Sequence, residues 1–320
     1  MRAAVVSSYS ASPRFAEFPD PVPTRDDDMV VDVLAAGLHP RVRSQAAGSH
    51  YTSTGELPLV PGVDGVGRGG DGLLRYFLLA DTTLGSMAER TVIDVRRSVV
   101  LPADSDPVAV AAGMNPAMSS WVALRQRVQF RAGQHVLILG ATGNAGQLAV
   151  QIARLFGAGR IIAAGRDAQR LATLSETGAT ETVSLSGPPA SVARELGRAA
   201  CDVDVVIDYL WGEPTSAAMV AVVTGRADRG KPLTWIEIGA IAGPSAPIPS
   251  AALRAARLTI VGSGQGSVRT HEYVAELPAL ADAITARMLE VDARAVPLAE
   301  VERAWADAGA TQRVVLIPQP

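Results

Sequence analysis

The stretch "LILGATGNAGQLAVQIARLFGAGRIIAAGRD", residues 137–167, decides how this chain folds. An apolar run leads through a glycine-rich turn into an amphipathic run and then a second apolar run, which predicts strand, turn, helix and strand. Gly140, Gly143 and Gly146 lie in the turn, where glycine permits positive φ angles and leaves the space of a Cβ free. The free amide groups and the dipole at the start of the helix would then attract a pyrophosphate. This order of elements predicts a dinucleotide-binding site.

The residues around this turn indicate which dinucleotide would bind. An acidic residue at the end of the second strand would hold the ribose 2′-hydroxyl of NAD, but this chain has Gly165 and Arg166 there. An arginine binds a 2′-phosphate through a charge-assisted fork, and Arg170 could reach the same phosphate. Asp167 fits better as the N-cap of the next helix than as the acid that binds the ribose. The sequence therefore predicts NADPH as the cofactor, held partly by the turn residues Thr142, Gly143, Asn144 and Ala145.

Composition limits the remaining possibilities. The chain has 320 residues, of which 48% are hydrophobic and 19% are charged, so it can bury sizeable cores. The formal net charge of −3 gives no electrostatic reason to expect nucleic acid or an anionic membrane as a partner. No apolar run is long enough for a membrane span or a secretory signal, so we expect a cytoplasmic protein. The single cysteine, Cys201, excludes an intrachain disulfide and a four-cysteine zinc site.

The pattern of the chain changes near Pro107. Before it, short β-prone runs alternate with glycine- and proline-rich breaks such as "LVPGVDGVGRGGDG", which predicts antiparallel strands in a barrel-like domain. After it comes a helix-like run that we expect Pro116 to interrupt. Strand-like and helical runs then alternate as far as "LTIVGSG", which predicts a parallel sheet covered on both faces. Two helices and a last strand, "QRVVLIP", follow.

In its order of parts the chain resembles the medium-chain dehydrogenase/reductase superfamily, and within it the zinc-free quinone oxidoreductase and enoyl reductase branch. "AAGLHP", "LPLVPGVDGVG", "MAERTVID", "NPAMSSW", the glycine turn and "IGAIAG" carry the resemblance, which covers nearly the whole chain. It implies an α/β fold, with a Rossmann-type doubly wound parallel sheet and a β-rich GroES-like barrel domain. The implied domains are residues 1–110 (catalytic), 111–265 (NADPH-binding) and 266–320 (returning to the catalytic domain).

The resemblance also bears on metal binding. At the positions where zinc-dependent members hold their catalytic metal, this chain has His39, Val63–Asp64 and Asn115. One histidine and one acid, with no thiolate, do not form a zinc site, so we expect no metal. His39 beside Pro40 is then a pocket or structural histidine.

Further site residues follow from the same resemblance. In zinc-free relatives the nicotinamide lies between the domains, near positions that match Asn115 and Ser119. Later positions matching the cofactor site are Leu210, Ile238, Gly239, Ala240, Ser263 and Gly264. Relatives often show asparagine, proline and then an acid in the first loop, whereas this chain has "HPRVRSQAAGSHY". The proton donor is therefore left open between Tyr51, its neighbour His50 and water.

These observations predict a zinc-independent, NADPH-dependent oxidoreductase that reduces a quinone or an α,β-unsaturated carbonyl by hydride transfer. The alternative is a non-catalytic NADPH-binding protein with a structural or redox-sensing role, because both hypotheses share the whole nucleotide site. Relatives commonly pair the edge of the nucleotide-binding sheet across a two-fold axis. Since "LTIVGSG" reads as that edge, we expect a homodimer.

Overall fold

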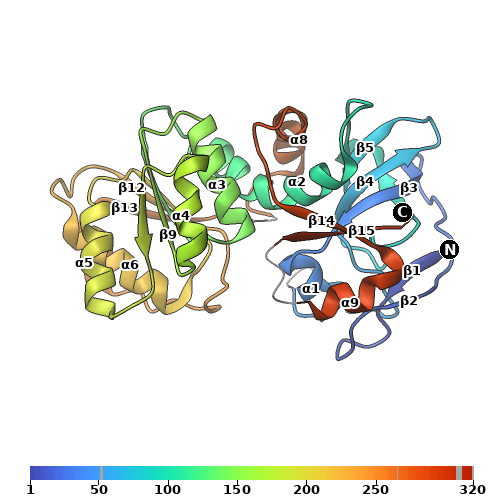
Figure 1. Cartoon of the computed structure of the whole chain (residues 1–320), viewed down its shortest axis with the longest axis horizontal. Coiled ribbons are helices and arrows are strands. Elements are labelled where there is room, and N and C mark those ends of the chain that lie inside the picture. Colours follow the sequence, from blue (N-terminus) through green and yellow to red (C-terminus); the bar gives the residue numbers. More distant parts are fainter. Residues whose placement is uncertain (51–52, 265, 308–311, 319–320) are drawn as a thin grey trace. The chain divides into compact units, whose positions relative to one another are not determined.

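The computed structural model describes residues 1–50, 53–264, 266–307 and 312–318, and Figure 1 shows their secondary structure. The chain forms two compact units. One consists of Met1–Asn115 together with Val274–Pro320, and the other of Pro116–Tyr273. The chain crosses between them within the helices α2 (Pro107–Val122) and α8 (Thr270–Thr285).

The unit Pro116–Tyr273 is built on a six-stranded parallel sheet, as the alternation of strands and helices predicted. Its strand order is β10-β9-β8-β11-β12-β13. The strands are β8 (His135–Leu139), β9 (Arg160–Gly165), β10 (Glu181–Ser184), β11 (Val205–Asp208), β12 (Leu233–Glu237) and β13 (Leu258–Gly262). Because the order reverses between β8 and β11, the carboxyl ends of these two strands form the switch point where open parallel sheets bind ligands.

Helices cover the sheet because its strands are apolar on both sides. They are α3 (Asn144–Leu155), α4 (Ala168–Thr177), α5 (Pro189–Ala199), α6 (Gly212–Gly225) and α7 (Ser250–Ala255). The helices α5 and α6 lie side by side (Figure 1), where a Cβ on Gly197 would come within 2.8 Å of the Ala221 carbonyl oxygen. Leu137, Ile162, Val206 and Trp235 are fully buried in the core beneath them.

The other unit contains a mainly antiparallel seven-stranded sheet and a separate β1–β2 pair, which confirms the prediction of antiparallel strands. The strands from the first part of the chain are β1 (Arg2–Val5), β2 (Arg14–Glu17), β3 (Asp28–Gly37), β4 (Asp64–Gly69), β5 (Leu74–Leu78), β6 (Arg90–Asp94) and β7 (Ser98–Val100). The end of the chain adds β14 (Ala293–Pro297) and β15 (Arg313–Ile317), and β15 pairs with β3. The helices are α1 (Pro40–Ala46) and α9 (Val301–Ala306), with the short 3₁₀ segments η1 (Val95–Arg97) and η3 (Leu298–Glu300).

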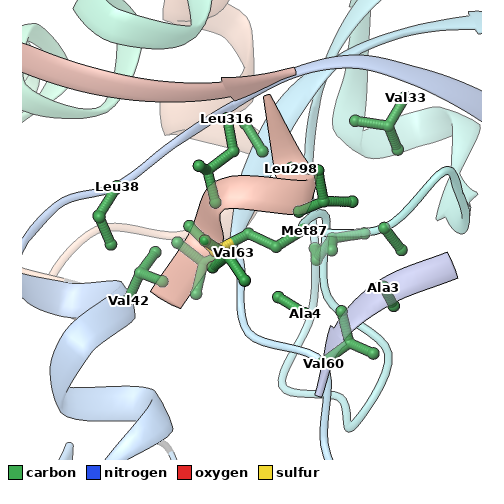
Figure 2. Packing of buried hydrophobic residues seen from close by; sticks show 14 of the residues in the cluster. Ala3, Ala4, Val33, Leu38, Val42, Val60, Val63, Met87, Leu298 and Leu316 are labelled. Carbon is green, nitrogen blue, oxygen red and sulfur yellow. The ribbon is translucent and has the colours of Figure 1, made fainter. Parts of the chain in front are cut away.

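The core of this unit joins distant parts of the sequence. Figure 2 shows the side chains of Val63, Met87 and Leu298 among those that gather there, and each is almost completely buried. Leu316 of β15 and Val42 of α1 belong to the same cluster. The last residues of the chain therefore complete a core that the first hundred residues begin.

Two expectations about local structure were wrong. The glycine-rich run at residues 59–72 predicts a break between strands, but it contains β4. Its glycines are needed inside the strand, because a Cβ on Gly67 would lie 2.8 Å from the Asp32 carbonyl oxygen and one on Gly65 would lie 3.0 Å from that of Ala35.

Pro116 does not interrupt α2, which continues from Pro107 to Val122. A proline removes only one backbone donor, and buried neighbours such as Met114 and Ala117 pack this helix on both sides of it. A π-helical turn, η2 (Ala123–Arg127), follows directly. Among the helices of the described residues, none is both long and apolar enough to cross a bilayer.

Candidate functional site

The glycine turn between β8 and α3 is shaped by close contacts with its neighbours. Gly140 has a φ of +83°, and a Cβ there would lie 3.1 Å from Leu210 Cδ2. A Cβ on Gly146 would collide with the Gly140 carbonyl oxygen and the Ala141 backbone, so α3 can approach the turn only because residue 146 is glycine. At Gly143 a Cβ would meet only the Gly140 carbonyl oxygen, at an ordinary 3.5 Å. Protein packing therefore requires two of the three glycines and leaves space beside the third.

The end of β9 lies against the same turn. A Cβ on Gly165 would come within 2.5 Å of Thr142 Cγ2, which explains the glycine before Arg166. Arg166 is exposed, and Ser186 Oγ donates to its carbonyl oxygen at 3.1 Å. Asp167 is the N-cap of α4 and accepts from the Arg170 amide at 3.0 Å, which confirms the predicted cap.

Arg170 is committed to the protein itself. Its Nη1 donates to the Thr142 carbonyl oxygen at 2.8 Å, and its Nε lies 3.7 Å from Asp167 Oδ2. The predicted pair of arginines thus differs in its surroundings: Arg170 fixes the glycine turn, whereas Arg166 extends into solvent. Thr142 is held by its carbonyl group, and Asn144 and Ala145 begin α3, whose N-cap Gly143 offers no side chain to cap the helix.

Residues that follow β11 and β12 lie beside the turn. The amide groups of Ile238 and Gly239 donate to the Asp208 carbonyl oxygen at 2.8 and 3.2 Å, and the Ala242 amide donates to the Leu210 carbonyl oxygen at 2.8 Å. Since Leu210 also lines Gly140, the predicted residues Leu210, Ile238 and Gly239 belong to one group at the switch point. Ala240 continues the segment with its side chain exposed.

Ser119 joins this group through a tyrosine that the sequence reasoning missed. Ser119 Oγ donates to the Pro116 carbonyl oxygen at 2.6 Å, so its one proton is used, and Tyr209 OH donates to Ser119 Oγ at 2.9 Å. Burial raises the pKa of Tyr209 to about 12, and hydrogen bonds to Ser119 and Ser120 oppose that shift. Tyr209 is therefore a neutral donor at physiological pH. Its position directly before Leu210 was the only signal in the sequence.

The remaining predicted cofactor residues are Ser263 and Gly264, which follow β13, and Asn115 of α2. Ser263 follows β13 and is buried, with its amide donating to the Glu237 carbonyl oxygen at 2.8 Å. The Gly264 amide donates to Ser267 Oγ at 2.8 Å. Arg127 fixes this segment by donating to the carbonyl oxygens of Gly262 and Ser267 at 2.9 and 3.1 Å. Asn115 ends the first of the two segments of the other unit and is half-buried.

In that other unit, His39 and Asp64 form a buried pair. His39 Nε2 lies 3.1 Å from Asp64 Oδ1, Tyr76 OH donates to Asp64 Oδ2 at 2.8 Å, and Ser86 Oγ donates to the Asp64 carbonyl oxygen at 2.6 Å. Burial lowers the pKa of His39, Asp64 opposes the shift, and Arg313 and Arg41 lower the pKa further. A neutral His39 donating to Asp64 fits both observations, and His39 has the structural role that was one of the two expected for it.

Of the two side chains predicted as proton donors, the structure describes His50. His50 is half-buried; burial lowers its pKa, Arg41 lowers it further and Asp81 opposes this. Tyr51 lies outside the described residues. Within the described part of the chain, no three His, Cys, Asp or Glu side chains gather closely enough to hold a metal ion.

Comparison with known proteins shows which proteins this chain is similar to. Residues 145–282 match the model of a family described as zinc-binding dehydrogenase. Over 99% of its length the chain is 28% identical to the whole of a probable NADPH-dependent quinone reductase from Emericella nidulans. A solved quinone oxidoreductase from Thermus thermophilus, whose complex with NADPH is also known, has a TM-score of 0.80 and 26% identity, covering 99% of this chain and 100% of that one.

The chain is a medium-chain dehydrogenase/reductase. It belongs to the quinone oxidoreductase-like branch. A shorter match, 28% identical over 43% of this chain and 40% of the relative, is to a chloroplastic NADPH-dependent alkenal/one oxidoreductase from Arabidopsis thaliana. The predicted superfamily and branch are therefore confirmed.

In this medium-chain dehydrogenase/reductase, one buried acid organises the end of β11. Asp208 is fully buried, and its Oδ1 accepts from the amides of Leu210 and Trp211 at 2.8 and 3.2 Å. Its Oδ2 accepts from Thr215 Oγ1 at 2.6 Å and Trp235 Nε1 at 2.9 Å. The sequence pattern does not indicate this role of Asp208, because the partners of an acid inside an apolar strand are brought to it only by folding.

Proposed function

We propose that the protein is an NADPH-dependent reductase of quinones or α,β-unsaturated carbonyls, acting in the cytoplasm. The observation that carries the proposal is the exposed Arg166 at the end of β9, beside a glycine turn that leaves space at Gly143. Similarity to a quinone reductase over nearly the whole chain supports the same reaction class. The relatives reported above are all named as enzymes, which gives the non-catalytic alternative no support.

The residues of the turn fit a dinucleotide. The first amides of α3, with Thr142, Gly143, Asn144 and Ala145 around them, would bind the pyrophosphate, because Gly143 leaves the helix start uncovered. Arg166 would bind the 2′-phosphate with its guanidinium, and Arg170 would hold the turn in place through Thr142. Gly165, Leu210, Ile238, Gly239 and Ala240, together with Asn115, Ser119, Ser263 and Gly264, are proposed to complete the cofactor site.

When bound, NADPH supplies the hydride for the reduction. The protein's part is to orient the cofactor, exclude water and stabilise the negative charge that develops on the acceptor oxygen. Tyr209 is a neutral donor already directed at Ser119, so it fixes that side chain and does not deliver a proton. The proton is proposed to come from His50, Tyr51 or water.

We propose that no zinc takes part. His39 and Asp64 are bonded to each other, and Tyr76 and Ser86 occupy the carboxyl and carbonyl oxygens of Asp64. This donor set contains no thiolate and is already satisfied by hydrogen bonds, which does not suit Zn²⁺.

A homodimer is part of the proposal. The strand β13 is an edge of the parallel sheet, with Leu258, Ile260 and Val261 only half-buried. An apolar edge strand invites pairing with another chain, and a second copy paired across a two-fold axis would cover it.

NADPH oxidation measured by absorbance against a panel of quinones and enones tests the function. We expect turnover with at least one electron-poor acceptor in the presence of a chelator and none with simple alcohols and NADP⁺. Alcohol oxidation without reduction of any acceptor would refute the proposal.

A further inference from the structure

Trp211 has a backbone conformation that is adapted to glycine. Its φ is +52° and its ψ is −167°, in a region that residues with a Cβ rarely enter. The next residue, Gly212, has a φ of +69° but carries no Cβ and is not strained by it. Two consecutive residues thus have the positive φ that favours glycine, and one of them is a tryptophan.

Hydrogen bonds to the buried Asp208 hold the backbone of Trp211 in this conformation. Asp208 Oδ1 accepts from the Leu210 and Trp211 amides, and Thr215 and Trp235 immobilise the other carboxylate oxygen. These contacts need only the backbone of residue 211, so a glycine would make them equally well. The turn explains the positive φ, but it does not explain the tryptophan.

The indole itself is available to a ligand. Trp211 is half-buried, and its Nε1–H makes no hydrogen bond with the described part of the chain. The residue follows Leu210, whose side chain lines Gly140, at the carboxyl end of β11. Strained residues that the fold holds in place are concentrated at ligand sites, and open parallel sheets bind ligands at this edge.

We propose that Trp211 determines the specificity for the electron acceptor, with its indole packing against a flat, electron-poor conjugated ring. This inference rests on the proposed reductase function. The electron-rich face of an indole stacks favourably on an electron-poor ring, and the stacked area grows with the number of fused rings. A fused-ring quinone should therefore gain more from Trp211 than a small acyclic enone.

Three variants separate the ring from the strain. Trp211→Phe keeps an aromatic ring at the strained position, Trp211→Ala keeps the strain without a ring, and Trp211→Gly removes both. We expect kcat/KM for naphthoquinone to fall about tenfold in the Ala and Gly variants and about threefold or less in the Phe variant. With methyl vinyl ketone, kcat/KM should change about twofold or less in all three, and the Kd for NADPH should be unchanged.

Thermal unfolding gives the second readout. The Gly variant should have a higher Tm than the Ala variant, because only Gly relieves the strain, although glycine normally destabilises ordered backbone relative to alanine. Equal losses with both acceptors, or no loss with either, would overturn the proposed role of the indole. A parent protein that reduces neither acceptor would instead contradict the reductase function on which the inference rests.

Discussion

Arg166 and Arg170 show how two identical side chains, four residues apart, acquire different tasks. The Arg170 guanidinium bonds to the Thr142 carbonyl oxygen, whereas Arg166 is exposed at the end of β9. We expect Arg166→Ala to weaken NADPH binding about tenfold, or about 1.4 kcal/mol, and to leave NADH binding unchanged. Calorimetric titration with each cofactor measures both constants.

Arg170→Ala is the matched control. Loss of its bond to Thr142 loosens the turn that both cofactors would use, so the Kd values for NADPH and NADH should rise by similar factors. If the parent protein bound NADPH and NADH equally, Arg166 would have no part in recognising the 2′-phosphate.

His39 predicts a pH dependence of stability. Its pKa is lowered by burial in the folded protein, so the unfolded chain takes up a proton first as the pH falls. The contribution of His39 to the free energy of unfolding is complete above about pH 6.5, the ordinary pKa of a histidine. Below that pH it decreases by at most about 1.4 kcal/mol per pH unit. We expect Tm to fall between pH 7.5 and pH 5.5, and to fall less in His39→Asn, whose amide can still donate to Asp64.

The second histidine with a lowered pKa, His50, acts in the same pH range and needs its own control. Asp28, with a pKa of about 2, titrates far below this range and does not interfere. If His39→Asn and the parent protein lost the same Tm between the two pH values, with His50→Asn also unchanged, burial of a neutral His39 would be contradicted.

At the scale of elements, two glycines of the turn between β8 and α3 have different roles: Gly146 allows the helix to pack, and Gly143 leaves space for a ligand. A methyl group at residue 146 collides with backbone atoms of Gly140 and Ala141, whereas one at residue 143 has ordinary contacts. We expect Gly146→Ala to lower the free energy of unfolding by about 1–3 kcal/mol. Gly143→Ala should unfold like the parent but bind NADPH at least tenfold more weakly. Chemical denaturation and cofactor titration of both variants check this, and equal stabilities would show that α3 can move away from the turn.

The same turn shows why much of the fold could be predicted. The apolar runs that became β8, β9, β11, β12 and β13 are short and separated by helical periodicity, and their local pattern is enough to identify them. The strand β4 was missed because glycine in a strand signals a turn locally. Gly65 and Gly67 are instead required by contacts with β3 and β5, which no local pattern contains.

The candidate site divides in the same way. Gly140, Gly165 and Arg166 follow a spacing along the chain, so they could be found in the sequence. The bonds of Asp208 to Trp235 and of Tyr209 to Ser119 link residues 27 and 90 positions apart, and they exist only in the folded sheet. The conformation of Trp211 is likewise a result of those distant contacts.

At the scale of the whole molecule, backbone geometry decides how a second copy could pair with β13. Neighbouring residues of a strand direct their backbone groups to opposite sides. The Ser263 amide donates to Glu237 of β12, whereas the Gly262 carbonyl oxygen accepts from Arg127 on the other side. Residues two apart in a strand direct their backbone groups to the same side, so Ile260, like Gly262, directs its amide and carbonyl groups to the open edge.

Ile260→Pro should therefore dissociate the dimer. Proline lacks the outward N–H but leaves the bonds of Thr259 and Val261 toward β12 intact, and edge strands tolerate proline at such positions. Light scattering at micromolar concentration should give the parent twice the chain mass of 33.2 kDa, and Ile260→Pro a single chain mass. Ile260→Val, which keeps the N–H and an apolar β-branched side chain, should stay dimeric. The proline variant should retain the Kd for NADPH, because the proposed turn, Arg166 and Leu210 all lie within one chain. A dimeric Ile260→Pro protein would place the contact elsewhere, and a monomeric parent would remove the reason for an apolar edge at β13.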